Sequence, residues 1–137
     1  MDEISLLDRI RADYARFPDN QDYDLYAEDV EFRDPLNRFR GRDRYRANIG
    51  FIARWFRDID LQLHDLGREG DILHTRWTLS FTSPLPWRPR TVIHGHTEMS
   101  LNAEGLIARH IDTWETPPLA VLRQQWPGRR TAPESRL

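Results

Sequence analysis

Three ionisable side chains are candidates for acid–base chemistry. His110 and Asp112 stand two positions apart in a segment where polar and apolar residues alternate, so both project from the same face of a predicted strand. Asp34 precedes Pro35 at the end of a short apolar segment, where the proline favours extended backbone. Burial makes a carboxylate hold a proton more tightly, and imidazole titrates near neutrality. Such groups in one pocket could transfer a proton to or from a ligand.

Structural roles are the alternative for the same residues. Asp34 could cap the turn that follows it or pair with a nearby arginine, and His110 could be hydrogen-bonded inside a filled core. Asp112 could likewise pair with an arginine, because charged groups are rarely buried without a partner.

A second group of polar side chains lies in the segment HGHTE. His94, His96 and Glu98 alternate along one predicted strand and therefore point the same way. They could bind a divalent metal, with His74 from a neighbouring strand, because imidazole and carboxylate are common ligands. This spacing is easily met by chance. We expect no metal, and favour an exposed or intersubunit surface on which Glu98 offsets Arg109.

Composition narrows the possible functions. The 137 residues carry 39% hydrophobic side chains, enough for one core, and we expect a single domain over 1–126 and a disordered tail over 127–137. The absence of cysteine excludes disulfides, zinc–thiolate sites and cysteine nucleophiles. No apolar segment is long enough to span a membrane, and the acidic start does not resemble a signal peptide. We therefore expect a soluble, cytoplasmic protein.

All 20 basic residues are arginines, and they nearly balance 22 acidic residues to give a net charge of −2. This balance predicts neither nucleic-acid nor membrane binding. One local exception is the segment 33–46, which has six arginines and two aspartates. We interpret it as a solvated turn and the start of a helix; an acidic ligand or partner surface is the alternative.

Periodicity places the candidate residues on secondary-structure elements. Apolar residues at helical spacing predict helices, and alternation predicts strands. The expected helices are 3–17, 22–27, 42–56 and 119–126. The expected strands are 30–34, 59–63, 73–81, 91–101 and 106–115. Helices followed by long antiparallel strands indicate an α+β fold.

The segment NAEG, residues 102–105, predicts the turn of a hairpin between the last two strands. If these four residues form the whole loop, Leu101 faces Leu106 and the inner-face pairs follow by counting. These pairs are Thr97 with His110, Gly95 with Asp112, and Ile93 with Trp114. Gly95 would leave space beside Asp112, in an apolar concavity typical of a small-molecule site. A one-residue bulge would swap the faces.

Two segments, LYAEDVEFRDPLNRFRGRDRYRANI and EGLIARHIDTWE, resemble the NTF2-like superfamily, particularly its SnoaL-like members and ketosteroid isomerases. The resemblance runs from Ile4 to about Glu115. It implies a cone-shaped α+β fold in which a curved antiparallel sheet and N-terminal helices enclose one pocket, often in a homodimer formed through the convex sheet face. Asp34 matches the general base of the isomerases, and His110, Asp112 and Trp114 match last-strand positions that line the pocket.

The match has a departure that bears on activity. Thr97 stands where the isomerases have an acidic donor to the substrate oxyanion, so we do not expect steroid isomerisation. Nor does the chain carry a phosphate loop or a cofactor motif, and we expect no cofactor.

We therefore predict a pocket protein that binds a small, mostly apolar molecule. The alternative is a cofactor-independent acid–base enzyme of the isomerase, dehydratase or cyclase type, acting on a small carbonyl or hydroxyl compound. Asp34 would be its base, His110 the acid–base partner and Asp112 the group that orients His110. The side chains expected to contact the ligand are Tyr14, Tyr26, Trp77, Gly95, Thr97, Met99 and Trp114.

Overall fold

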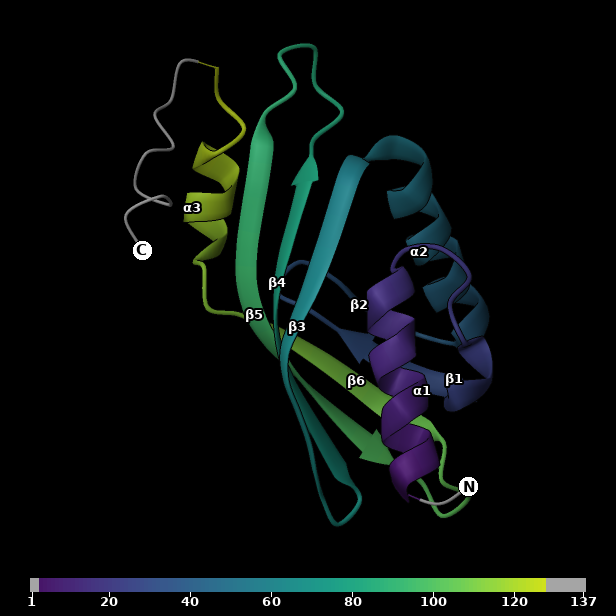
Figure 1. Cartoon of the computed structure of the whole chain (residues 1–137). Helices are drawn as coiled ribbons and strands as arrows, with labels where there is room; N and C mark the ends of the chain where they lie inside the picture. The colour runs from purple at the N-terminus through teal and green to yellow at the C-terminus, as the bar shows by residue number, and fades with distance from the viewer. Residues whose placement is uncertain (1–2, 128–137) are drawn as a thin grey trace.

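The computed structural model describes residues 3–127 and contains a curved six-stranded sheet whose one face is covered by two long helices (Figure 1). The strand order is β2-β1-β6-β5-β4-β3. The helices are α1 (Glu3–Arg16), the short 3-10 helix η1 (Tyr23–Leu25), α2 (Arg42–Trp55) and α3 (Pro118–Arg123). The strands are β1 (Tyr26–Arg33), β2 (Arg38–Arg40), β3 (Arg57–Glu69), β4 (Ile72–Thr82), β5 (Arg90–Leu101) and β6 (Ile107–Trp114). This architecture confirms the predicted α+β class.

Helices α1 and α2 form where the apolar spacing predicted them. Leu6 and Ile10 of α1 are buried, as are Tyr45 and Ile49 of α2, so each helix turns one apolar stripe towards the sheet. Figure 1 shows both helices over the inner face of the sheet, while α3 lies beside β5. The sheet and these helices therefore enclose the interior from opposite sides.

The start of β1 differs from the prediction. The helix expected at 22–27 is wrong beyond Leu25, because the chain enters β1 at Tyr26 instead of residue 30. Tyr26 is buried and pairs with Ile107 of β6, a contact between residues distant in the sequence that extends the strand backwards. The short strand β2 was also not predicted.

The pairing of β1 corrects the sheet type. β1 runs antiparallel to β2 but parallel to β6, so the sheet is mixed and not wholly antiparallel. The other neighbouring strands are antiparallel. In the parallel pair Phe32 lies beside His110, which brings the beginning of the chain against the last strand.

The β5–β6 hairpin keeps the predicted faces but not the predicted partners. The loop occupies 102–106, so Leu101 pairs with Ile107, and a second shift at Ala108 pairs Ser100 with Arg109. Two shifts of one residue each leave the alternation of faces unchanged. The observed pairs are Met99 with His110, Thr97 with Asp112 and Gly95 with Trp114, in place of the pairs predicted two residues away.

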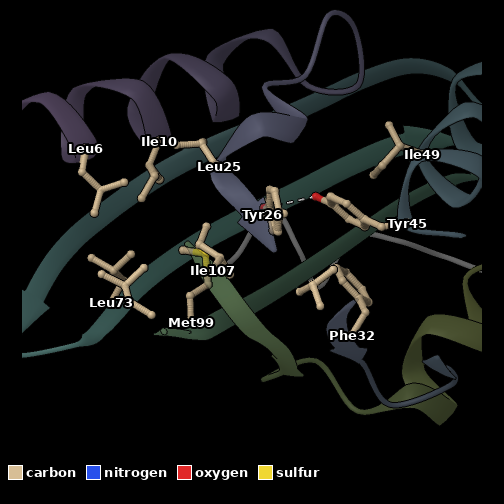
Figure 2. Close-up of a cluster of buried hydrophobic side chains, with 12 residues drawn as sticks. Leu6, Ile10, Leu25, Tyr26, Phe32, Tyr45, Ile49, Leu73, Met99 and Ile107 are labelled. Carbon is tan, nitrogen blue, oxygen red and sulfur yellow. Dashed lines mark hydrogen bonds between the residues drawn. The ribbon is translucent and has the colours of Figure 1, made fainter. Parts of the chain in front are cut away.

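The hydrophobic core fills one end of the space between helices and sheet (Figure 2). Leu6 and Ile10 of α1 face Leu73, Met99 and Ile107 of the sheet. Tyr26, Tyr45 and Phe32 continue this cluster towards the cavity described below.

No helix in the described part of the chain is long and apolar enough to cross a membrane. The predicted tail at 127–137 lies outside the described residues except for Pro127. The predicted terminal helix forms as the shorter α3.

Candidate functional site

A cavity of about 940 Å³ lies between the inner face of the sheet and the helices. Its walls are mostly apolar. The sheet contributes Leu61, Leu79, Phe81 and Ile93, the helices contribute Ile49, Phe51, Ile52, Leu119, Val121 and Leu122, and Phe56 follows directly after α2. A concave apolar space of this size is typical of small-molecule sites.

The mouth of the cavity is bordered by large apolar side chains that are exposed. Leu36, Phe51, Leu119 and Leu122 both line the cavity and face solvent. Helix α3 is held beside β5 by Gln124, whose side-chain Oε1 accepts from the Val92 backbone N–H at 2.7 Å while Nε2 donates to the Val92 carbonyl at 3.1 Å. The Gln124 side chain thereby makes the two hydrogen bonds that a neighbouring strand would make to Val92, at a position that β6 does not reach.

Polar groups inside the cavity form one connected hydrogen-bond network. His110 Nε2 lies 2.9 Å from Asp112 Oδ1, and the Thr97 hydroxyl donates to the same oxygen at 2.5 Å. Trp77 Nε1 in turn donates to Thr97 Oγ1 at 2.8 Å. Three neighbouring strands, β4, β5 and β6, therefore supply the network, and the groups from β5 and β6 converge on one carboxylate oxygen.

The network continues through the other nitrogen of His110. Its Nδ1 lies 3.4 Å from the Tyr26 hydroxyl, which lies 3.4 Å from the Tyr45 hydroxyl (Figure 2). The imidazole also stacks on Phe32, with ring centroids 4.4 Å apart. His110 is thus held in place on its faces as well as at both nitrogens.

The direction of these hydrogen bonds follows from the chemistry of the groups. With Asp112 as a carboxylate, Nε2–H of a neutral His110 donates to it, which leaves Nδ1 as an acceptor for the Tyr26 O–H. Tyr26 has then used its hydrogen and accepts from Tyr45. Each hydrogen in the network therefore points, step by step, towards Asp112.

Burial keeps three tyrosines of the cavity wall protonated. Desolvation is the largest cause raising the pKa of Tyr14, Tyr26 and Tyr45, because a phenolate loses its hydration in the interior. The negative charge of Asp112 raises the pKa of Tyr14 and Tyr45 further. The Tyr14 hydroxyl lies 2.8 Å from Thr75 Oγ1. These side chains can therefore act as hydroxyl donors and acceptors at neutral pH.

Asp13 adds a second carboxyl group to the cavity wall. Burial raises the pKa of Asp13, although a hydrogen bond from the Asp22 backbone N–H and the charge of Arg16 oppose the shift. Asp13 was not among the candidate site residues identified from the sequence.

Two predicted ligand contacts are not among the cavity-lining residues. Gly95 lies beneath the indole of Trp77, where an added Cβ would be 2.6 Å from a ring carbon, so the glycine makes room for Trp77 and not for a ligand. Met99 is 1% exposed and belongs to the hydrophobic core. Tyr14, Tyr26, Trp77, Thr97 and Trp114 do line the cavity.

Asp34 lies at the edge of the cavity, in the turn between β1 and β2. Its Oδ1 accepts from the backbone N–H groups of Leu36 and Asn37 at 2.8 and 2.7 Å. No hydrogen bond in the described part of the chain joins Asp34 to His110. The carboxylate therefore organises the turn, and the proposed partnership of Asp34 with His110 stays a prediction.

The outer face of the sheet carries the other candidate group. His94 Nδ1 lies 3.0 Å from the Thr78 hydroxyl, and His96 Nδ1 lies 3.3 Å from Glu115. No three His, Cys, Asp or Glu side chains among residues 3–127 are placed to hold a metal ion.

The expected offset of Arg109 by Glu98 is wrong, because Arg109 pairs with Glu31 at 3.4 Å. Three more arginines, Arg33, Arg38 and Arg40, lie within 4 Å of the same carboxylate. Their charges, led by Arg109, lower the pKa of Glu31, although desolvation acts in the opposite direction as the largest single cause. Three of the six arginines in the segment 33–46 thus lie around the Glu31 carboxylate.

Sequence reasoning did not identify Tyr45 and Phe32 as site residues. Both lie within a predicted helix or strand, and the pattern of that element does not mark them as site residues. The available signal was the hydroxyl of Tyr45, which needs a hydrogen-bond partner when it is buried.

Comparisons with known proteins support the fold independently. The model of the family described as "Uncharacterized conserved protein (DUF2358)" matches residues 4–110. A search of curated proteins gives no match. Among solved structures, an NTF2-like protein of unknown function from Exiguobacterium sp. 255-15 has 21% identity and a TM-score of 0.60, and the match covers 82% of this chain and 94% of that protein.

Two further structures extend this similarity. TsrD from Streptomyces laurentii has 24% identity and a TM-score of 0.70, with 91% of this chain and 96% of that protein covered. A protein with a ketosteroid isomerase-like fold from Catenulispora acidiphila, solved with trimethylamine, has 16% identity and a TM-score of 0.69, with 87% and 90% covered. SnoaL-like proteins from Mesorhizobium loti and Shewanella denitrificans also match. Because the family model spans most of the sequence, the chain belongs to the DUF2358 family, and the structural matches show that its fold is the NTF2-like fold.

Proposed function

We propose that this protein binds a small, mostly apolar molecule inside the cavity, with the polar part of the molecule at the His110–Asp112 network. The observation that carries the proposal is the distribution of side chains: apolar walls lead from an exposed apolar mouth to a connected set of polar groups. Such a site buries the apolar body of a ligand by the hydrophobic effect and orients its polar end by hydrogen bonds.

A binding assay with a blocked cavity tests this proposal. Nile red, a neutral dye that fluoresces in apolar surroundings, should bind with saturation. Leu79→Trp would add bulk inside the cavity, whereas Gln62→Trp places the same side chain on the exposed part of β3 as a control. We expect Leu79→Trp to weaken binding by about tenfold or more, as the loss of a binding volume requires, and Gln62→Trp to bind as wild type does. Equal binding by all three proteins would place the dye elsewhere and refute the proposal.

Proton transfer is a second candidate function, and the His110 network favours it. In this relay the ligand gives a proton to Tyr45, and Tyr45 gives its own proton to Tyr26. Tyr26 in turn gives its proton to Nδ1 of a neutral His110. Asp112 then faces an imidazolium and stabilises its charge. This relay would suit isomerase, dehydratase or cyclase chemistry on a carbonyl or hydroxyl compound.

Hydrogen–deuterium exchange into small ketones detects this chemistry without knowledge of the substrate. In heavy water, wild type should speed exchange at carbons next to the carbonyl, measured by proton NMR, and His110→Gln should abolish the acceleration. Asp34→Asn tests whether Asp34 or His110 acts as the base. If it removes exchange while His110→Gln keeps it, Asp34 and not the network carries the proton.

The homodimer expected through the outer sheet face belongs to the same proposal. His96, Glu98 and Arg109 of this face are exposed. Light scattering at working concentrations should give twice the chain mass, and the mass of a single chain would contradict the expectation. A cytoplasmic location likewise stays a prediction, for which localisation of the tagged full chain is the measurement.

A further inference from the structure

We infer that the cavity selects cationic ligands, namely amines or ammonium compounds with an apolar body, and that Asp112 receives the positive charge. The inference rests on the proposed function, because it names the class of molecule that the cavity binds. Its support comes from the charges that line the cavity, from the free oxygen of Asp112 and from the direction of the hydrogen bonds.

The distribution of charge is the first observation. The chain has 20 basic residues, all arginine, yet none of the described side chains that line the cavity is an arginine. Three aspartates, Asp13, Asp34 and Asp112, do line it. Among these described residues His110 is the one group that can become positively charged. An anionic ligand would therefore enter a site without a fixed positive charge, whereas a cation would find carboxylates.

The free oxygen of Asp112 is the second observation. Its Oδ1 takes the hydrogen bonds of both Thr97 and His110, whereas Oδ2 has no hydrogen-bond partner among residues 3–127. The side chain is 19% exposed and belongs to the cavity wall. A carboxylate oxygen with unused lone pairs is an acceptor, and charge-assisted hydrogen bonds from ammonium groups are the strong ones.

The direction of the network is the third observation. Trp77, Thr97, Tyr26 and Tyr45 have already donated their polar hydrogens to other members when His110 is neutral. The network thus presents acceptors to the cavity, and its best complement is a donor or a cation. Trp77 and Trp114 stand on the same inner face as Asp112, where aromatic rings add attraction for a cation.

A matched ligand series tests the inference. Decylammonium, decyltrimethylammonium, decanol and decanoate share one chain length and differ in the charge and hydrogen-bonding capacity of the head group. Their dissociation constants are measured at pH 7, below micelle formation, by displacement of Nile red from the full-length protein. We expect both cations to bind about tenfold or more tightly than decanol, and decanoate to bind most weakly, because a carboxylate attracts either positive head group and the primary ammonium adds a charge-assisted hydrogen bond that trimethylammonium cannot donate.

Variants then locate the charge preference. In Asp112→Asn the ratio of the decanol and decylammonium constants should fall to near one, while Asp60→Asn, which removes one exposed charge from β3, should keep the wild-type ratio. The wild-type series decides the question even if Asp112→Asn fails to fold.

The outcomes separate the two proposals. If no compound displaces the dye, the proposed binding function fails. If decanol binds and the cations bind no tighter, or decanoate binds best, binding stands and the inference about charge is overturned. An unchanged ratio in folded Asp112→Asn would overturn the assignment to Asp112.

Discussion

Replacement of Gly95 by alanine tests the geometry on which the inner face of the site depends. Gly95 lies between Trp77 of β4 and Trp114 of β6, and the indole of Trp77 covers it. An alanine Cβ would be 2.6 and 2.7 Å from two ring carbons of Trp77 and 2.8 Å from the Thr113 carbonyl oxygen. These distances are below van der Waals contact, and one of the opposing atoms belongs to the backbone, so both the ring and a strand must shift.

The expected cost follows from two effects. Overpacking a buried site costs about 1–3 kcal/mol, and displacement of the indole strains or breaks its hydrogen bond to Thr97, which contributes about 1 kcal/mol. We therefore expect Gly95→Ala to lower the free energy of unfolding by about 2–4 kcal/mol. For a chain of this length that corresponds to a fall in Tm of roughly 8–15 °C.

Urea denaturation followed by tryptophan fluorescence measures the change, and Gly50→Ala is the matched control. Gly50 is exposed within α2 and nothing lies within 4 Å of its added Cβ, so alanine there should stabilise the protein by about 0.5–1 kcal/mol. Combining Gly95→Ala with Trp77→Phe should recover part of the loss, because the smaller ring relieves one of the two clashes. If Gly95→Ala is as stable as wild type, the placement of Trp77 over the glycine is incorrect.

Two further predictions concern contacts outside the cavity. Glu31→Gln should lower stability at pH 7, because four arginines lose their shared counter-charge. Since the folded pKa of Glu31 is depressed below its ordinary value of 4.5, its stabilisation is present above pH 4.5 and is lost as the pH falls through the folded pKa. Wild type should accordingly lose more stability than the variant below pH 4.5 in urea titrations, and parallel pH curves would contradict this. Gln124→Ala should cost about 1–3 kcal/mol through loss of both hydrogen bonds to Val92, and should speed amide exchange of Val92, whereas unchanged protection would show that the clamp is dispensable.

Local pattern accounts for most of the predicted elements. The helical spacing of Ile10 in α1 and of Tyr45 and Ile49 in α2 reflects the burial of one stripe, which the structure shows directly. Alternation did the same for β4, whose inner residues Leu73, Thr75 and Trp77 are buried, and for β5, whose inner residues Ile93, Thr97 and Met99 are buried. Where buried and exposed positions alternate regularly along one helix or strand, the sequence alone predicts that element and its buried face.

Pairing between distant segments was not available from local pattern. The parallel contact of β1 with β6 decides that Tyr26 is in a strand and that Phe32 stacks on His110. Similarly, the Trp77–Thr97 hydrogen bond depends on the indole crossing Gly95, which no spacing rule indicates. The predicted register of the hairpin is wrong for a related reason, because the loop spans 102–106 instead of 102–105 and the strand contains a further irregularity at Ala108.

Candidate site residues fall into the same two groups. His110 and Asp112 could be placed together because they share one strand face, and alternation is a local property. Asp34 was linked to them by its position at a strand end and by the resemblance, and its carboxylate is engaged by the N–H groups of its own turn. The contribution of Tyr45 required knowledge of where α2 crosses the sheet.

Because of the two offsets in the β5–β6 hairpin, the number of residues in that turn determines which side chains of β6 face the interior. Deleting one residue from 102–106 without removing the irregularity at Ala108 would rotate the rest of the strand by half a period, sending His110 and Asp112 to the solvent and Arg109 and Ile111 inwards. Removing one residue at each place would restore the orientation of both. The turn therefore tolerates insertions or deletions of an even number of residues. A peptide grafted into the turn should change its length by an even number, so that His110 and Asp112 keep facing the interior.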